Sequence, residues 1–247
     1  MNNKDLGVLV GLLLTDGCVA KPRTVVFHNK SEAMHDLFQE HATKLFGNIH
    51  FSNGIQKNGT KITLISNKKI VNELLNACNL KTFRRKQYEN GTCPKMKLPT
   101  FIKNLPESAK LNFLQTVFTA DGSISVSIRW HKRNKNWEIR RRIELSCKHP
   151  RLRKDFYEMI ENLGFNPRTS CDNITLERKE DILRFAKLVR FIPKVKVGGD
   201  SKSWEGFEKN KILDLAVKTL DFRKKDLENL GTKKDAIDFL RSHISTS

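Results

Sequence analysis

Apolar residues dominate two helix-length segments of the chain, and each segment runs into Asp-Gly. Residues 6–19 read LGVLVGLLLTDGCV and residues 111–124 read LNFLQTVFTADGSI. An aspartate at a helix C-terminus is unfavourable because the unpaired carbonyls there carry partial negative charge. A surface helix end with Gly17 as a left-handed cap would explain one such segment. The recurrence of Asp16 as Asp121, 105 positions later, indicates an internal repeat.

The pattern after each Asp-Gly also repeats. In both copies, strand-like alternation predicts two strands, a helix of 3.6-residue period follows, and two more strands and a closing helix complete the copy. The later strands are expected at 24–27, 49–51, 61–65, 142–145, 167–170 and 173–177, and the later helices at 31–47, 68–78, 149–165 and 179–189. We therefore expect an α+β fold of two pseudo-symmetric αββαββα repeats, over 1–105 and 106–220, with a helical tail over 221–247.

Charge and cysteine usage narrow the partners and the compartment. The 247 residues hold 46 Lys plus Arg against 27 Asp plus Glu, a net charge of +19. Such an excess favours a polyanionic partner, and the apolar run over 8–14 is shorter than the roughly 20 residues of a membrane span. The five cysteines form no CxxC pair. This pattern indicates a reducing intracellular setting, namely cytoplasm, nucleoid or the matrix of a DNA-containing organelle.

The two Asp-Gly segments resemble the paired motifs of a LAGLIDADG homing endonuclease of the single-chain, monomeric type. Residues 9–17 read LVGLLLTDG and residues 114–122 read LQTVFTADG. Leu14 and Thr119 stand where an earlier acid often appears, and Thr116 replaces the usual close-packing glycine. The resemblance implies two curved sheets forming a DNA-binding saddle, with a central two-helix interface.

Close packing of these two helices would place their terminal carboxylates side by side. Small residues, Gly11 in the first helix and Thr116 in the second, permit such an approach. The carboxylates of Asp16 and Asp121 would repel each other unless a cation lies between them, and Mg²⁺ suits hard oxygen ligands. We expect two or three Mg²⁺ ions there, with the carbonyls of Thr15 and Ala120 as further ligands. Metal ions so placed can activate water for an in-line displacement at phosphorus.

The resemblance also implies a basic residue near each cleaved phosphate, after the last strand–helix unit of each repeat. Lys97 and Lys196 fit this place, with Lys95 and Lys194 as their rivals. A solvated lysine in a loop is the ordinary alternative for all four. The ends of the second strands supply further candidates: Asn29, Lys30, Cys147 and Lys148.

The strand over 123–131 alternates cleanly between two faces. Ile124, Val126, Ile128 and Trp130 share the face expected to pack on helices, while the serines, Arg129 and His131 share the face free to read DNA. From 129 to 154 the net charge is +9, from 11 basic and 2 acidic residues. A basic two-stranded ribbon suits the major groove. Expected DNA-binding residues are Lys21, Arg23, His28, Asn29, Lys30, Lys57, Lys61, Arg129, His131, Lys132, Arg133, Lys135, Arg140, Arg142 and Lys148.

These features together predict Mg²⁺-dependent hydrolysis of one phosphodiester in each strand of a long asymmetric DNA site. The plain Met start, with no splicing cysteine and no terminal His-Asn, favours an intron-encoded enzyme over an intein. Two alternatives stay open, an RNA maturase and a non-cleaving DNA-binding regulator on the same scaffold. Retention of both acids favours the nuclease. Residues 221–243 read as one or two short basic helices, expected to serve as a lid or packing element.

Overall fold

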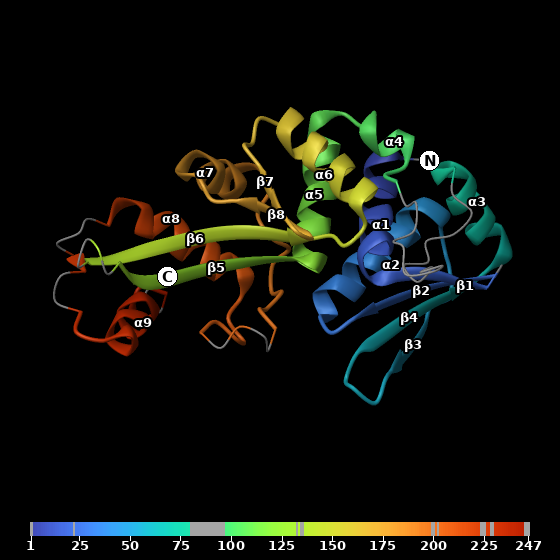
Figure 1. Cartoon of the computed structure of the whole chain (residues 1–247). Helices are drawn as coiled ribbons and strands as arrows, with labels where there is room; N and C mark the ends of the chain where they lie inside the picture. Colours follow the sequence, from blue (N-terminus) through green and yellow to red (C-terminus); the bar gives the residue numbers. More distant parts are fainter. Residues whose placement is uncertain are drawn as a thin grey trace.

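The computed structural model places two similar halves side by side, with the first helix of each half between their sheets (Figure 1). It describes residues 2–21, 23–79, 97–131, 133, 136–198, 201, 203–222, 226–227 and 230–244, with only the backbone of 19–21 described. In the described residues, no helix is long and apolar enough to cross a membrane.

The first half follows the expected αββαββα order. Its elements are α1 (Asn3–Asp16), β1 (Gly17–Lys21), β2 (Thr24–Asn29), α2 (Glu32–Phe46), β3 (Ser52–Ile55), β4 (Lys61–Ser66) and α3 (Lys68–Cys78). The four strands form an antiparallel sheet in the order β1-β2-β4-β3.

The second half repeats that order and the sheet topology. After the short α4 (Thr100–Lys103) come α5 (Glu107–Asp121), β5 (Gly122–His131), β6 (Asn136–Ser146), α6 (Pro150–Asn162), β7 (Arg168–Ser170), β8 (Asn173–Leu176) and α7 (Lys179–Leu188). The sheet order is β5-β6-β8-β7, again antiparallel. The α+β architecture of two repeats is therefore confirmed, because the same pattern of apolar positions builds the same sheet twice.

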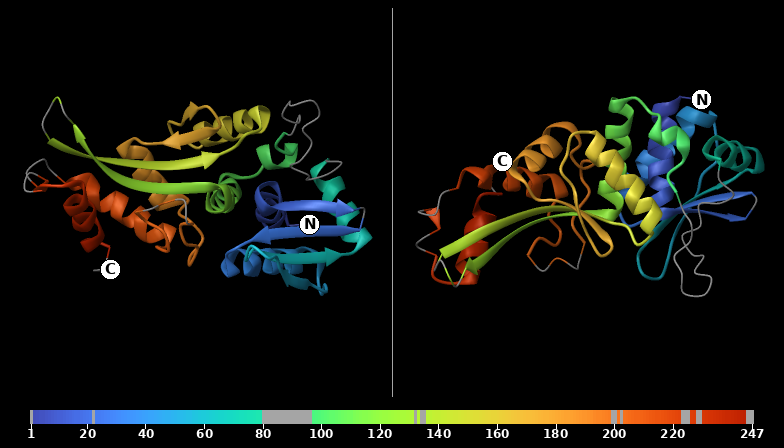
Figure 2. Two further views of the ribbon diagram at one scale, coloured as in Figure 1. Left: turned by 60° about the horizontal axis from the view of Figure 1, so that its bottom comes forward. Right: turned by 45° about the horizontal axis from the view of Figure 1, so that its top comes forward.

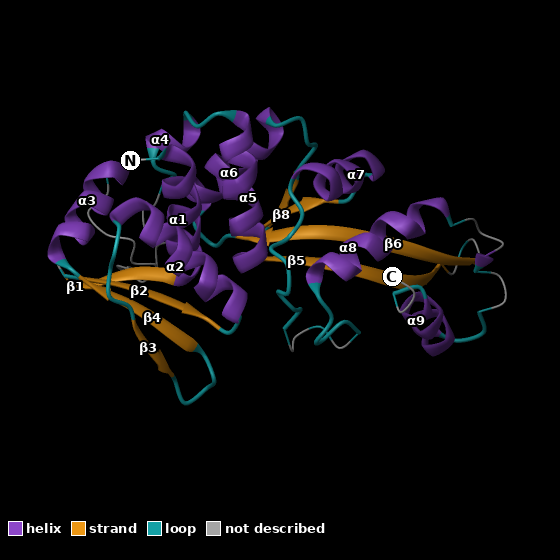
Figure 3. Cartoon of the chain, turned by 180° about the vertical axis from the view of Figure 1, so that it is seen from behind, coloured by secondary structure: helices purple, strands orange, loops and turns teal. Residues whose placement is uncertain are grey.

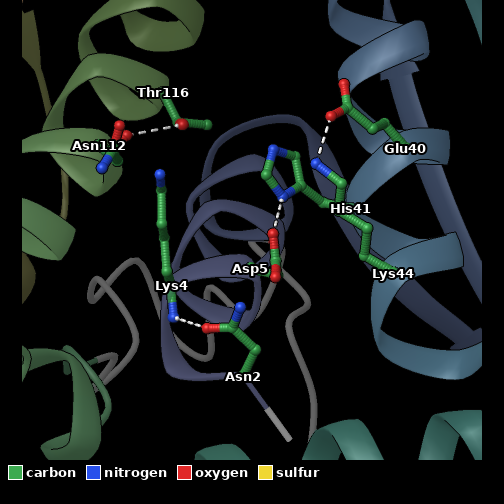
Figure 4. Close-up of polar contacts among 8 residues, drawn as sticks. All are labelled: Asn2, Lys4, Asp5, Glu40, His41, Lys44, Asn112 and Thr116. Carbon is green, nitrogen blue, oxygen red and sulfur yellow. Dashed lines mark hydrogen bonds and ion pairs between the residues drawn. The ribbon is translucent and has the colours of Figure 1, made fainter.

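The α1 helix is buried because residues 6–14, its middle turns, contain only apolar residues and glycine. Residues from Asp5 to Thr15 are all buried, as a helix without a polar face requires. Its one buried acid has a partner on α2, since His41 Nδ1 lies 2.8 Å from Asp5 Oδ1 (Figure 4). This contact fastens α1 to the helix that covers the first sheet.

The α1–α5 interface lies where the small residues predicted it. A methyl group built on Gly11 would lie 3.2 Å from Thr116 Cγ2 and 3.4 Å from Phe113 Cδ2. One turn earlier, a methyl group on Gly7 would lie 3.1 Å from Leu105 Cδ1. The prediction that Gly11 and Thr116 face each other is confirmed, and there is no room at this contact for a larger side chain.

Several elements differ from the expectations. The short α4 was not predicted, and the strand expected at 142–145 is β6, which begins at Asn136. The strand expected at 49–51 is wrong: Ile49 and Phe51 pack against the core, but the strand β3 begins at Ser52. The apolar pattern there marks contact with the core, whereas strand pairing follows the register with β4, in which Ser52 faces Leu64. The helix α8 (Lys209–Lys218) was not anticipated at all.

The tail packs against the long β5–β6 hairpin, which extends away from the central helices (Figures 2 and 3). Helix α8 and the tail helix α9 (Lys233–Ser242) both contact β5, the edge strand of its sheet. The indole of Trp204 donates to the Val126 carbonyl at 2.8 Å, and that of Trp137 to the Leu230 carbonyl at 2.6 Å. The described part of the tail therefore covers a strand edge that would otherwise be open to pairing.

Candidate cleavage centre and nucleic-acid interface

Both central helices end at an aspartate and pass directly into a strand. Gly17 and Gly122 have extended backbones, with φ of −110° and −98°, so the interpretation of Gly17 as a left-handed cap is wrong. Glycine is needed for space instead. A Cβ on Gly17 would lie 2.6 Å from Leu13 Cα, and one on Gly122 would lie 2.4 Å from the Phe118 carbonyl oxygen.

The geometry of the helix pair brings the two aspartates to one end. Gly11 meets Thr116, and the residues that meet Gly7 precede α5, so the two helices run in the same direction. Asp16 and Asp121 each lie five residues beyond that contact, about 7.5 Å along the helix axis at the α-helical rise. Both acids therefore lie at the C-terminal end of the pair, where the helix dipoles are also negative.

Asp16 is held by an amide from the end of β2. Asn29 Nδ2 donates to Asp16 Oδ2 at 2.8 Å, and Asn29 Oδ1 accepts from the backbone N–H of Ser31 at 2.8 Å. The Asn29 carbonyl in turn accepts from the buried ring of His35, whose Nε2 lies 3.0 Å away. The candidate Asn29 thus contacts the predicted centre directly, with its own orientation fixed from two sides.

His28 also interacts electrostatically with the carboxylate of Asp16. Burial lowers the pKa of His28, while the charge of Asp16 raises it and His35 lowers it further. Burial is the largest of these effects, so the pKa lies below its ordinary value and His28 is mostly neutral at neutral pH.

A buried lysine that the sequence pattern missed lies beside the second acid. Lys209 Nζ donates to the carbonyls of Thr119 and Gly122, each at 2.6 Å, and these two residues flank Asp121 in the chain. Burial lowers the pKa of Lys209 to about 8, opposed by the charges of Asp121 and Asp16. No motif marks this residue, because it begins the helix α8, which the periodicity did not predict.

An open cleft of about 920 Å³ lies between the two halves and is lined by Ala120 and Gly122, the chain neighbours of Asp121. Neither Asp16 nor Asp121 is among the described residues that line it. The first half contributes the segment from Asn29 to Ala33 together with Asp36, and the second contributes the end of α5 and the start of β5. Four basic residues of the described chain line it: Lys30, Lys194, Lys196 and Lys209. The structure thus brings the candidates Asn29, Lys30, Ala120 and Lys196 to one cleft, and keeps Lys194 beside Lys196.

The candidate lysines of the first half are placed differently. Lys97 is exposed and is not among the described residues that line the cleft, and the backbone N–H of the next residue, Leu98, donates to Asp155 on α6. Its rival Lys95 lies outside the described residues. The role predicted for Lys97 therefore stays a prediction.

The exposed face of β5 and β6 carries the expected polar and basic residues. Ile124, Val126 and Ile128 are buried, and Ser123, Ser127 and Arg129 are exposed, as the alternation predicts. Trp130 is the exception: it is 45% exposed and contacts the Trp137 ring at 5.3 Å, instead of packing under a helix.

The three consecutive arginines of β6 have different environments. A hollow of about 370 Å³ on the exposed face is lined by the three arginines and by serines of β5, together with two acids, Glu144 and Glu177. Arg140 is exposed, but Arg142 Nε lies 2.5 Å from Glu177 Oε1, so its charge is partly compensated. Arg141 points to the other face and donates from Nε to Thr219 Oγ1 at 2.8 Å. Part of the basic run is thus structural.

The remaining predicted DNA contacts divide into three groups. Arg23, Lys57, Arg133 and Lys148 are exposed, and His131 is half-buried. Lys61 is ion-paired with Glu32, which compensates its charge. The side chain of Lys21 and the whole of Lys132 and Lys135 lie outside what the structure describes.

The described residues contain no cluster of three or more His, Cys, Asp or Glu side chains that could hold a metal ion. A site made of Asp16 and Asp121 therefore needs further oxygen ligands, and the carbonyls of Thr15 and Ala120 lie next to the two acids in the chain. Such a donor set fits Mg²⁺, which usually binds one or two carboxylates and takes its remaining ligands from water and phosphate.

Residues 108–192 match the sequence model of the LAGLIDADG-like domain. The structure of the meganuclease I-SmaMI bound to uncleavable DNA is 12% identical, with 97% of each chain covered and a TM-score of 0.58. The structure of I-DmoI in complex with DNA and Ca is 16% identical, covers 78% of this chain and 95% of that one, and has a TM-score of 0.52. I-DmoI is a homing endonuclease. No curated protein matches the sequence. This chain thus contains a LAGLIDADG-like domain and has, as a whole, the two-sheet fold of the LAGLIDADG homing endonucleases.

Proposed function

We propose that this protein is a monomeric, intracellular, site-specific endonuclease, encoded in an intron, that hydrolyses one phosphodiester in each strand of double-stranded DNA. The observation that carries the proposal is the placement of Asp16 and Asp121 at one end of the packed helix pair, beside a cleft lined by lysines. Two acids at negative helix ends are unfavourable unless cations or hydrogen-bond donors compensate their charge, which is what a bound divalent ion would do. The structures of I-DmoI with DNA and Ca or Mn are consistent with divalent ions in this fold.

In this proposal the aspartates at the helix ends and the residues that line the cleft have different roles. Asp16 and Asp121, with the carbonyls of Thr15 and Ala120, would hold Mg²⁺. When bound, the metal supplies an activated water and neutralises charge on the leaving oxygen. Lys196 and its neighbour Lys194 are exposed in the cleft and would position the scissile phosphate. Asn29 orients the carboxylate of Asp16.

The two sheets would bind unequal lengths of DNA. Strands β5 and β6 contain 10 and 11 residues, whereas β1 and β2 contain 5 and 6. At about 3.3 Å per residue, the longer hairpin spans roughly twice the length of groove. The second sheet also carries the exposed Arg129 and Arg140, so we expect a long, asymmetric target with most of the affinity in the half bound by β5 and β6.

The test uses duplex DNA carrying the exon junction at which the encoding intron is inserted, incubated with Mg²⁺, with Ca²⁺ and with chelator. Wild-type protein should cut both strands in Mg²⁺. Asp16→Asn and Asp121→Asn should bind the duplex in Ca²⁺ but cut it at least about 100-fold more slowly, because each removes one charge from the centre. Their thermal stability should hold or rise, since neutralising one acid relieves repulsion on the other.

Either variant cutting both strands at the wild-type rate would show that the paired aspartates are not the centre. RNA binding by a wild-type protein that cuts no duplex would favour the maturase alternative. Duplex binding without cleavage and without RNA binding would favour a DNA-binding regulator.

A further inference from the structure

The two aspartates are equivalent in the repeat but have different neighbours. Gly17 pairs with Phe27 and Gly122 pairs with Leu145, so Asn29 and Cys147 occupy matching positions two residues further along β2 and just past β6. Asn29 donates an amide N–H to Asp16. A thiol is a far weaker donor, and Cys147 Sγ lies 3.7 Å from the His149 carbonyl oxygen. The second half therefore has a thiol at the position from which the first half presents an amide.

In the second half, Lys209 contacts the backbone around the aspartate, whereas Asn29 in the first half contacts the carboxylate itself. Its ammonium bridges the carbonyls of Thr119 and Gly122 and so spans the backbone that carries Asp121. It also lies 5.6 Å from the centre of the Phe191 ring, an apolar surrounding that strengthens its electrostatic interactions. Without this ammonium, two buried carbonyls would lose a charged donor and the α5–β5 junction would be free to relax.

The backbone of Lys209 fixes the cleft loop as well. Its N–H donates to the Val195 carbonyl at 2.9 Å, and the preceding Glu208 forms a β-bridge with Lys196. One residue thus connects the end of α5, through its side chain, to the loop that carries Lys194 and Lys196, through its main chain. The separation between Asp121 and those lysines depends on it.

We infer that Lys209 is a positioning residue for the half of the centre built on Asp121, so that the two DNA strands are cut by halves that depend on different side chains. This inference rests on the proposed endonuclease function. A shift of about 1 Å in a reacting group can cost on the order of 100-fold in rate, so loss of the Lys209 bridge should slow one strand far more than the other.

The experiment measures the cleavage rate of each strand separately, on duplex labelled at both ends, for wild type, Lys209→Met and Asn29→Ala. Lys209→Met keeps the length and apolar character of the side chain and removes the ammonium. We expect it to slow one strand at least about 10-fold more than the other and to accumulate nicked plasmid. Asn29→Ala, the counterpart in the first half, should slow the opposite strand. Affinity for the duplex in Ca²⁺ is measured for each variant as well, and both strand rates are taken at saturating protein, so that weaker binding cannot alter the strand ratio.

A purely structural role for Lys209 would slow both strands alike, so a strand ratio within about twofold of wild type would overturn the inference. The same bias in both variants would overturn it too. If Lys209→Met melts below the assay temperature, the ratio is measured on Lys209→Gln, which keeps one donor, and the same two results would support or overturn the inference. A wild type that cuts neither strand would count against the endonuclease function itself, and is therefore distinguishable.

Discussion

At the scale of single residues, the two aspartates depend on neighbouring side chains that hold them, or the backbone around them, in place. Asn29 touches Asp16, and His35 holds the carbonyl of Asn29. Lys209 does the same for the backbone around Asp121. Of these residues only Asn29 was a candidate from the sequence, yet all three influence how each acid is oriented.

The titration of Lys209 should be visible in stability. Its pKa in the folded protein is about 8, below the ordinary 10.5, so the unfolded chain holds more protons than the folded one between these values. The free energy of unfolding should therefore rise with pH through this window, by on the order of 3 kcal/mol at about 1.4 kcal/mol per pKa unit. Below pH 8 the full cost of the buried charge is present.

Urea unfolding of wild type and Lys209→Met at pH 7.5, 9 and 10 measures this effect. The difference between the two proteins isolates Lys209 from other groups that titrate at alkaline pH. Wild type should gain stability relative to the variant as the pH rises. A difference that stays constant over the three pH values would mean that the Lys209 ammonium is not destabilised by its surroundings.

At the scale of elements, the contact between α1 and α5 holds the two halves together. Gly11→Leu should overpack it, because even a methyl group there would lie 3.2 Å from Thr116 Cγ2. We expect a loss of about 1–3 kcal/mol or more in the free energy of unfolding. Cleavage should fall together with stability, since the same helices carry the aspartates.

Gly54→Leu is the matched control. Gly54 lies on the exposed strand β3, and a Cβ there would meet no atom within 4 Å. The same substitution at this open position should leave stability within about 0.5 kcal/mol of wild type. Equal melting of the Gly11→Leu variant and wild type would show that the helices do not pair at Gly11.

At the scale of the whole molecule, the net charge of +19 predicts binding that weakens steeply with salt. With on the order of ten phosphate contacts, log K should fall with log salt at a slope near −9. Replacing Arg140 and Arg142 together should flatten that slope. Arg140→Ala should account for most of the change, by about one contact, because Arg142 is already paired with Glu177.

Lys187→Ala serves as the control for this titration, since Lys187 is exposed on α7, a helix that packs on the opposite side of the second sheet. Its slope should equal that of wild type. A wild-type slope near zero would exclude a duplex bound along the sheets. A duplex competitor is needed because RNA binding would also depend on salt.

The sequence by itself determined the repeat, the order of its elements and the placement of both aspartates at helix ends. These features follow from local periodicity, which predicted α3 at its observed bounds and the presence of every strand of the second half, although β6 is longer than the 142–145 expected for it. The close approach at Gly11 was also predictable, because a small residue in an otherwise bulky apolar helix allows a second helix to pack closely there.

Tertiary structure alone decided which residues distant in sequence pair with each other, in strand register, in hydrogen bonds and in ion pairs. The start of β3 depends on register with β4, and the burial of Lys209 depends on contact with carbonyls about 90 positions earlier. The charge of Arg142 is partly compensated by Glu177, the residue that follows the neighbouring strand β8. None of these contacts produces a periodic pattern in the sequence. Each is fixed by strand pairing or by packing between elements that meet only once the chain has folded.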